Sequence, residues 1–166
     1  MIASGQVRLE GMTSQTVSHV LIHLAAQDFF EDQPDHVSQK TAVFFLRWIT
    51  HDWPMAECVK ILKKLHAASS SASKVILVEQ VVPYACSSPY KFSGMNNLAP
   101  PAPLLANLGQ AYSDVYTTDF TMAVLLNAQE RTVGEFEEMT SAAGWKISQI
   151  YQTAGSCLSE IVCEKA

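Results

Sequence analysis

Two apolar, β-rich runs with an amphipathic segment between them are the feature that most restricts how this chain can fold. The runs are TAVFFLRWI over residues 41–49 and KVILVEQVV over residues 74–82. Continuous apolar runs of this length are typical of strands that a parallel sheet buries on both faces. In the segment between them, four apolar residues recur at helical spacing: Cys58, Ile61, Leu62 and Leu65. Strand, helix and strand in this order predict a right-handed parallel βαβ unit, with Pro54 as the first helical residue.

The next residues predict a long loop and then a helix. Over residues 83–114 the sequence has prolines, serines, asparagines and glycines without a clear period, which indicates a loop. Loops of this length in a compact domain usually bind or cover something. Residues 119–127, DFTMAVLLN, follow with a helical period.

The end of the chain predicts a capped helix and a hairpin. Thr132 is followed three residues later by Glu135, which is the pattern of a capping box, and Gly144 marks the end of the same helix. Residues 146–153 and 157–165 alternate apolar and polar side chains, as the two strands of a hairpin do. The sheet is therefore expected to finish with antiparallel strands.

Composition and charge restrict the class of protein. The chain has 166 residues and is 48% apolar, which suits one globular domain over residues 1–166. The net charge is −5 and the 11 lysines and arginines are scattered, so no nucleic-acid partner is expected. No apolar run reaches the roughly 18 to 20 residues of a membrane span, and no signal-peptide pattern follows Met1. We therefore expect no membrane partner and a cytoplasmic location.

The cysteines and histidines form no disulfide framework or metal motif. No Cys-x-x-Cys pair is present, so reduced and buried thiols are expected at Cys58, Cys86, Cys157 and Cys163. His19 and His23 are four residues apart, a spacing that can bind metal on a helix, but no third ligand is in view. No metal site is predicted.

A titratable pair, His51 and Asp52, stands where the first apolar run ends and the helical pattern begins. Taken alone, such a pair is most often a helix cap, because an aspartate beside the first turn satisfies free N–H groups. Glu79 lies inside the second apolar run, where an unpaired carboxylate is costly to bury, so it indicates either a site or an exposed strand end. From the residues alone, both interpretations remain open.

Four motifs, taken in order, give the chain a family resemblance. They are FFLRWITHDWPMAECVKILKKL, VILVEQVVP, DFTMAVLLN and QERTVGEFEEMTSAAGW. They resemble those of the class I small-molecule O-methyltransferases that use S-adenosylmethionine (SAM), the plant and fungal caffeate- and flavonoid-O-methyltransferase-like family. Within that family, the proline-rich connection CSSPYKFSGMNNLAPPAPLLANLG most resembles fungal members. The resemblance implies an α/β fold: the C-terminal half of a partial Rossmann-like methyltransferase sheet, with parallel strands, a final antiparallel hairpin and flanking helices. It also implies SAM as cofactor and a small aromatic hydroxyl compound as substrate.

The same resemblance implies a catalytic set. His51 matches the general base that removes the phenolic proton while the oxygen attacks the methyl group. Glu79 and Glu130 match two acids that flank this histidine and fix its orientation and tautomer. An imidazole suits the task, because its ordinary pKa of about 6.5 lets it accept a proton near neutral pH.

Binding residues are implied in two groups. Asp28 and Phe29 match positions beside the adenine of SAM, and Arg47 matches a position near the cofactor. Trp53 is implied beside the site, and Met122 and Asn127 in the wall of the acceptor pocket. Without the family context, Asp28 and Phe29 would be a turn aspartate and a core aromatic, and Met122 would be a core residue.

Two departures from the family affect what the chain is expected to do. The glycine-rich SAM loop is missing, because the only glycines ahead of Asp28 are Gly5 and Gly11, and the N-terminal dimerisation domain is missing as well. The isolated chain is therefore expected to be inactive, with a homodimer only in the full-length form. Residues 11–25 interrupt the family pattern, and we interpret them as a retained intron or another gene-prediction artefact, the alternative being a real insertion. Other functions left open are a non-catalytic partner of a full-length methyltransferase and a SAM-fold protein with non-methylating chemistry.

Overall fold

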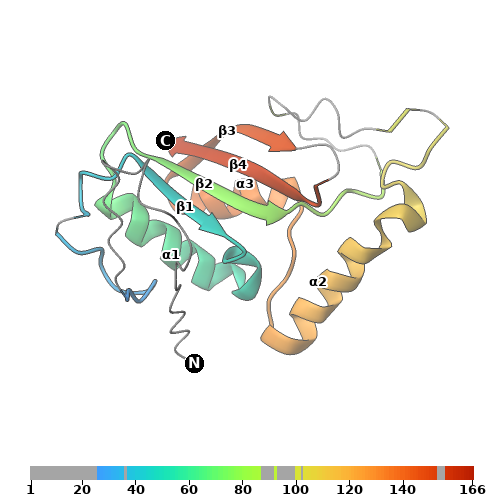
Figure 1. Cartoon of the computed structure of the whole chain (residues 1–166), viewed down its shortest axis with the longest axis horizontal. Coiled ribbons are helices and arrows are strands. Elements are labelled where there is room, and N and C mark those ends of the chain that lie inside the picture. Colours follow the sequence, from blue (N-terminus) through green and yellow to red (C-terminus); the bar gives the residue numbers. More distant parts are fainter. Residues whose placement is uncertain (1–25, 36, 87–91, 93–99, 102, 153–155) are drawn as a thin grey trace, which may run out of the picture.

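The computed structural model describes most of the chain after the first 25 residues. The described residues are 26–35, 37–86, 92, 100–101, 103–152 and 156–166. The interruption at residues 11–25, with His19 and His23, lies outside them. Figure 1 shows one mixed sheet with two helices against it and a third helix standing away from it.

The predicted βαβ unit is confirmed. Strand β1 (Val43–Arg47) pairs in parallel with β2 (Lys74–Gln80), and helix α1 (Met55–Ala68) connects them. The predicted apolar face of α1 is buried, with Cys58 and Leu62 fully enclosed. Pro54 is the N-cap of α1 rather than its first helical residue, so the predicted start is one residue early.

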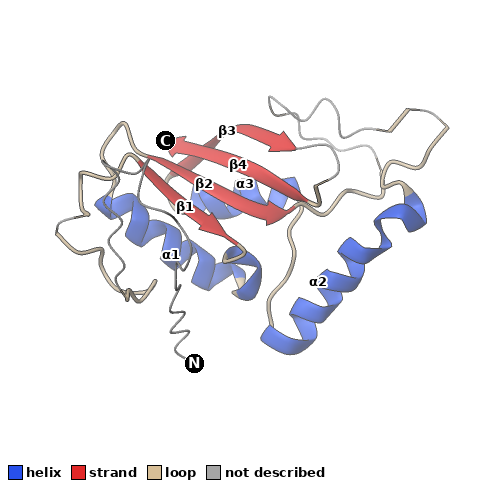
Figure 2. Cartoon of the chain, viewed as in Figure 1, coloured by secondary structure: helices blue, strands red, loops and turns tan. Residues whose placement is uncertain are grey.

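The predicted C-terminal half is also confirmed. Helix α3 (Val133–Ala142) begins with a complete capping box between Thr132 and Glu135. It ends ahead of Gly144, whose φ of +84° is unfavourable for residues with a side chain. Strands β3 (Trp145–Gln152) and β4 (Leu158–Lys165) pair antiparallel. Because β4 also pairs antiparallel with β2, the sheet has the order β1-β2-β4-β3 (Figure 2).

The hydrophobic core lies between one face of the sheet and helices α1 and α3. Alternate residues of the strands supply the sheet side, as Phe44 and Leu46 do from β1. The helices supply side chains such as Leu62 and Phe136. Trp145, at the start of β3, is 1% exposed, and its Nε1 donates a hydrogen bond to the Leu62 carbonyl at 3.1 Å.

The prediction that the first strand is buried on both faces is wrong. In β1, Phe44 and Leu46 are buried, whereas Val43 and Phe45 are 46% and 63% exposed. The reason is that no element in the described part of the chain covers the outer face of β1, on which Val43 and Phe45 lie. The apolar run therefore correctly predicts a strand but not the number of its covered faces.

The predicted helix at residues 119–127 is longer at its start than the sequence pattern indicates. A short 3-10 helix, η3 (Gly109–Tyr112), leads directly into α2 (Ser113–Leu126), so the irregular connection ends before residue 109. Asn127 is the C-cap of α2, with a left-handed φ of 52°. Part of the predicted loop, including residues 87–91, lies outside the described residues. Across the described part of the chain, no helix combines the length and the hydropathy that a membrane span requires.

Candidate active site

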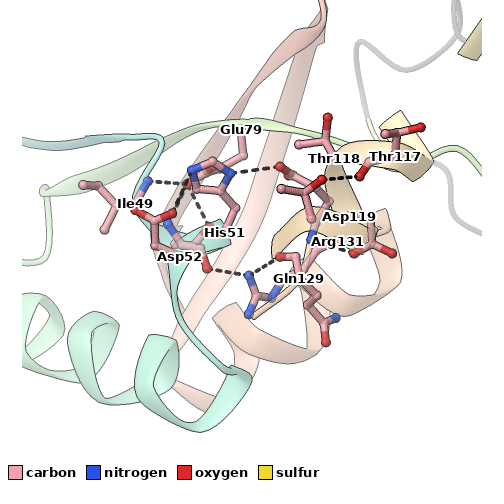
Figure 3. A network of polar contacts seen from close by, with 12 residues as sticks. Ile49, His51, Asp52, Glu79, Thr117, Thr118, Asp119, Gln129 and Arg131 are labelled. Atoms are coloured by element: carbon pink, nitrogen blue, oxygen red, sulfur yellow. Dashed lines mark hydrogen bonds and ion pairs between the residues drawn. The ribbon is translucent and has the colours of Figure 1, made fainter. Parts of the chain in front are cut away.

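The predicted catalytic residues gather where the parallel strands end. His51 lies in η1, a single 3-10 turn (Thr50–Asp52) that follows β1, and Glu79 is near the carboxyl end of β2. Glu130 precedes α3 in a segment that forms a β-bridge between Arg131 and Val81, directly after β2. The carboxyl ends of the strands are where open α/β sheets bind ligands. The fold thus brings together, at this edge, residues that are far apart in the sequence (Figure 3).

The two nitrogens of the His51 imidazole have different carboxylate neighbours. Nδ1 is 2.9 Å from Oε1 of Glu130, whose side chain is 2% exposed. Nε2 is 3.3 Å from Oδ1 of Asp52, whose side chain is 45% exposed. A buried carboxylate accepts a hydrogen bond best from an N–H group, which assigns the proton to Nδ1 and leaves the lone pair on Nε2. The basic nitrogen therefore lies on the more open side of the site.

Trp48 packs against the same imidazole. Its ring is edge-on to His51, with centroids 5.1 Å apart, and the guanidinium carbon of Arg47 lies over the Trp48 ring, 5.9 Å from its centroid. Trp48 has a φ of 56°, which a bulky residue adopts only under strain from its surroundings. That backbone conformation places an aromatic wall beside the predicted base.

Glu79 contacts the turn that carries His51 rather than the imidazole itself. Its Oε1 accepts hydrogen bonds from the backbone N–H of Ile49 at 3.1 Å, and from the backbone N–H and hydroxyl of Thr50, both at 2.8 Å. Burial raises the pKa of the Glu79 carboxyl, and the hydrogen bonds from Thr50 partly oppose that shift. Glu79 therefore acts on His51 through the backbone and through its charge.

The surroundings of His51 raise its pKa above the ordinary value of 6.5. The hydrogen bond with Glu130 is the largest cause, burial opposes it, and the charges of Glu130, Glu79 and Asp52 add to it. The folded protein therefore favours the protonated imidazole more than the unfolded chain does. Stability from this source is complete below pH 6.5 and is lost as the pH rises through the folded pKa of His51.

A titration of the imidazole signals by NMR tests this assignment. His51 is expected to titrate above pH 6.5, and Glu130→Gln is expected to lower its pKa, because the amide cannot supply the same charge-assisted bond. His66 in α1 provides the internal control, because burial lowers its pKa below 6.5. A His51 signal that titrates below 6.5 in the unmodified chain contradicts the assignment.

The residues implied beside the cofactor come from two places in the fold, Asp28 and Phe29 from one turn and Arg47 from the end of β1. Oδ1 of Asp28 accepts a hydrogen bond from the N–H of Phe30 at 2.9 Å, in an exposed turn. Phe29 lines a hollow of about 210 Å³ along the edge of β1, together with Phe44 and Phe45. This mostly apolar hollow is one that could hold the adenine ring of SAM. The described residues there provide no cluster of backbone N–H groups for its methionine end, so the fit to SAM is limited to the adenine.

The residues implied in the acceptor wall are not brought against His51. The Trp53 ring packs edge-on against Phe30 at 5.0 Å, and Met122 is half-buried in α2. Asn127 is exposed. Among the described residues, no hydrogen bond or ring contact joins any of these three side chains to His51. A hollow of about 320 Å³ beside Glu130 is lined from α2 by Asp119 and Ala123 instead.

Three residues at the site were not predicted from the sequence. Arg131 is 1% exposed and donates to the carbonyls of Thr50 and Trp53, at 2.6 and 2.7 Å. The Cys58 thiol donates to the same two carbonyls, and burial raises its pKa to about 11, so it stays protonated. Asp119 of α2 accepts a hydrogen bond from the Glu130 N–H at 2.9 Å. The only signal for Arg131 is its place beside Glu130.

The predicted state of the cysteines is correct in part. Cys58 and Cys163 are buried as expected, whereas Cys86 and Cys157 are exposed. All four are free thiols. In the described part of the chain, no group of three or more histidine, cysteine or acidic side chains could hold a metal ion.

The fold and the site agree with a family assignment. A family model described as the O-methyltransferase domain matches residues 8–146. The chain belongs to this O-methyltransferase family. The resemblance seen in the four sequence motifs is thereby confirmed, and the α/β fold it implies is the observed one.

Particular relatives can then be named. The chain is 37% identical over 134 residues to 4-O-methyltransferase 1 of the fungus Phanerochaete chrysosporium, a match that covers 78% of this chain and 28% of that protein. It is 34% identical over 136 residues to 3-O-methyltransferase 2 of the same fungus, covering 82% of this chain and 29% of that protein. The chain thus spans less than a third of the length of either relative.

Solved structures share the fold. The mitomycin 7-O-methyltransferase has a TM-score of 0.62 at 17% identity, covering 84% of this chain and 33% of that one. A pericyclic reaction enzyme has the same score, 0.62, at 20% identity, covering 87% of this chain and 32% of that one. Because one fold serves both activities, the fold alone does not decide between methyl transfer and other chemistry.

Proposed function

We propose that this chain is the base-bearing half of the catalytic domain of a SAM-dependent O-methyltransferase, acting on a hydroxyl of a small aromatic metabolite. One observation carries the proposal: Nδ1 of His51 is held 2.9 Å from the buried Glu130 carboxylate, with Nε2 on the open side. Family membership and the fungal relatives support the reaction type. The proposal includes a cytoplasmic location, and homodimer formation only in a full-length protein.

The residues of this chain divide the work of proton removal. Nε2 of His51 accepts the proton of the hydroxyl as its oxygen forms a bond to the methyl group. Glu130 fixes the tautomer and stabilises the imidazolium that results, as a carboxylate does beside any histidine base. Glu79 fixes the turn from which His51 projects. Bound SAM supplies the methyl group on a positively charged sulfur, which leaves as a neutral thioether.

We also propose which residues bind the cofactor and the acceptor. Phe29 and the hollow along β1 would hold the adenine. Asp28 and Arg47 are proposed at its margin because each is next in sequence to a residue that lines it, Phe29 and Leu46. The hollow between Glu130 and α2 would receive part of the acceptor. Met122 and Asn127 are proposed beside it because they are next in sequence to Ala123 and Ala128, which line it, and Trp53 is proposed near the acceptor from the family resemblance. Positioning is expected to contribute as much as proton removal, because in-line transfer requires oxygen, methyl carbon and sulfur to be aligned.

A hybrid enzyme tests the proposal directly. In it, the segment of the Phanerochaete 4-O-methyltransferase 1 that matches this chain is replaced by the corresponding residues of this chain. Transfer of a labelled methyl group from SAM to a panel of phenols is the expected result. A hybrid that folds by circular dichroism and binds SAM but methylates none of the phenols contradicts the proposal. Conversion of an acceptor without methyl transfer would favour the non-methylating alternative.

The isolated chain supplies a second measurement. A calorimetric titration with SAM is expected to give no binding of micromolar strength, because the described residues hold only the adenine end of the molecule. Micromolar binding to the isolated chain would contradict this assessment of the cofactor site.

A further inference from the structure

Arg131 is a buried cation whose hydrogen bonds all go to backbone carbonyls. It is 1% exposed. Nη1 donates to the carbonyl of Thr50 at 2.6 Å, and Nη2 donates to that of Trp53 at 2.7 Å. Nη1 also donates to the carbonyl of Gln129, at 3.2 Å. Thr50 and Trp53 are the residues on either side of the His51–Asp52 pair, so one side chain holds both ends of the turn.

The backbone of Arg131 is itself fixed to the sheet. Arg131 forms a parallel β-bridge with Val81, and its carbonyl accepts a hydrogen bond from the N–H of Val82 at 2.9 Å. Glu79, two residues before Val81, holds the N–H groups at the start of the same turn. Two side chains therefore hold the turn: Glu79 accepts hydrogen bonds from its N–H groups, and Arg131 donates hydrogen bonds to its carbonyls. Both residues are anchored at the end of β2 (Figure 3).

We propose that Arg131 is a positioning residue for His51. By holding the carbonyls of Thr50 and Trp53, its guanidinium keeps the imidazole at hydrogen-bond distance from Glu130, the residue before it in the chain. This inference rests on the proposed role of His51 as the base. A guanidinium suits the task, because its two terminal nitrogens form a rigid planar fork that can bind two carbonyls at once, whereas a lysine ammonium is a single point charge.

The substitution Arg131→Lys distinguishes the effect of the forked guanidinium from the effect of its positive charge, because lysine keeps the charge but not the fork. The groups that face His51 are the carboxylates of Glu130, Asp52 and Glu79, and the ring of Trp48. If Arg131 acted only through its charge, lysine would leave the pKa of His51 unchanged, and a neutral substitute would raise it. If Arg131 acts as a fork, lysine loosens the bond between Nδ1 and Glu130, and the pKa of His51 falls toward its ordinary value.

The experiment follows the His51 imidazole by NMR in the full 166-residue chain, with the signal assigned from its loss in His51→Gln. Arg131→Lys is expected to lower the pKa of His51 by roughly 0.5 to 1 unit, the size of a partial loss of a charge-assisted hydrogen bond. In a Glu130→Gln background the same substitution is expected to shift the pKa by less than about 0.2 unit, because the bond it acts through is already gone.

Cys58→Ala is the matched control. The Cys58 thiol donates to the same two carbonyls, but weakly, and it is buried in the core beneath the turn. This substitution is expected to lower the thermal stability of the chain while leaving the pKa of His51 within about 0.2 unit of its original value, because the fork remains. A general loss of stability is thereby distinguished from loss of position.

A measurement on the unmodified chain tests the proposal even if Arg131→Lys fails to fold. A fork bonded at both ends rotates slowly, so the terminal N–H signals of Arg131 are expected to be separate. A single averaged signal would overturn the proposal, as would an unchanged or raised His51 pKa in folded Arg131→Lys. None of these measurements requires methyl transfer, so an inactive hybrid enzyme would count against the proposed function and not against the fork.

Discussion

Replacing His51 by glutamine in the hybrid enzyme is expected to lower the rate of methyl transfer by roughly 10²- to 10⁴-fold, the usual contribution of a positioned general base. Glutamine keeps a polar side chain of similar reach but cannot accept the proton of the hydroxyl. The loss is expected in kcat, with a smaller change in the KM for the phenol, because the base acts on the reacting atoms in the transition state. Steady-state rates with labelled SAM measure both constants.

His66→Gln provides the control for this comparison. It removes an imidazole from α1, where the ring packs edge-on against Trp145, at the end of the sheet opposite to the carboxyl ends of β1 and β2. Its expected effect is confined to stability. If His51→Gln and His66→Gln lower the rate equally, or if His51→Gln leaves the rate unchanged, then His51 is not the base.

Replacing Glu79 by alanine is expected to cost about 3 to 5 kcal/mol of unfolding free energy, because it leaves buried donors without an acceptor. Those donors are the N–H groups of Ile49 and Thr50 and the hydroxyl of Thr50, all bonded to one carboxylate oxygen. Urea unfolding of the 166-residue chain, followed by tryptophan fluorescence, measures the difference.

Glu79→Gln is the companion variant. The glutamine amide oxygen can still accept hydrogen bonds from the same donors. The loss of unfolding free energy in Glu79→Gln is therefore expected to stay below about half of the loss in Glu79→Ala. Equal costs for the two substitutions would mean that the charge of Glu79, rather than its accepting oxygen, stabilises the turn. A cost below about 1 kcal/mol for alanine would mean that water replaces the carboxylate at this position.

Most of the fold follows from local sequence patterns. The spacing of Cys58, Ile61 and Leu62 identifies the buried face of α1, and Thr132 with Glu135 identifies the start of α3. These features are predictable because they depend on residues close together in the chain. The burial of β1 depends instead on which elements, distant in the sequence, pack against its faces. The prediction of burial on both faces failed for this reason.

The candidate site was likewise predictable only in part from the sequence. His51, Glu79 and Glu130 could be selected from motifs, and the fold places all three at one end of the sheet, which is compatible with the roles proposed for them. The resemblance implied Glu130 beside His51, but two other contacts could not be foreseen: the nearest carboxylate to Nε2 belongs to Asp52, and Glu79 binds backbone rather than ring. Arg131 has an ordinary sequence context, because a side chain that binds carbonyls far away in the sequence leaves no periodic pattern.

Helix α2 has a consequence for how this chain behaves in solution. Its apolar side chains surround the helix rather than forming one stripe, and Phe120 and Leu125 are each 71% exposed. Such a surface attracts hydrophobic dyes and other copies of itself, and only the repulsion from a net charge of −5 opposes association. Acidification toward the isoelectric point, about 5.4, neutralises carboxylates and removes that repulsion. Association, rather than unfolding, is therefore expected to limit the concentration of samples near this pH.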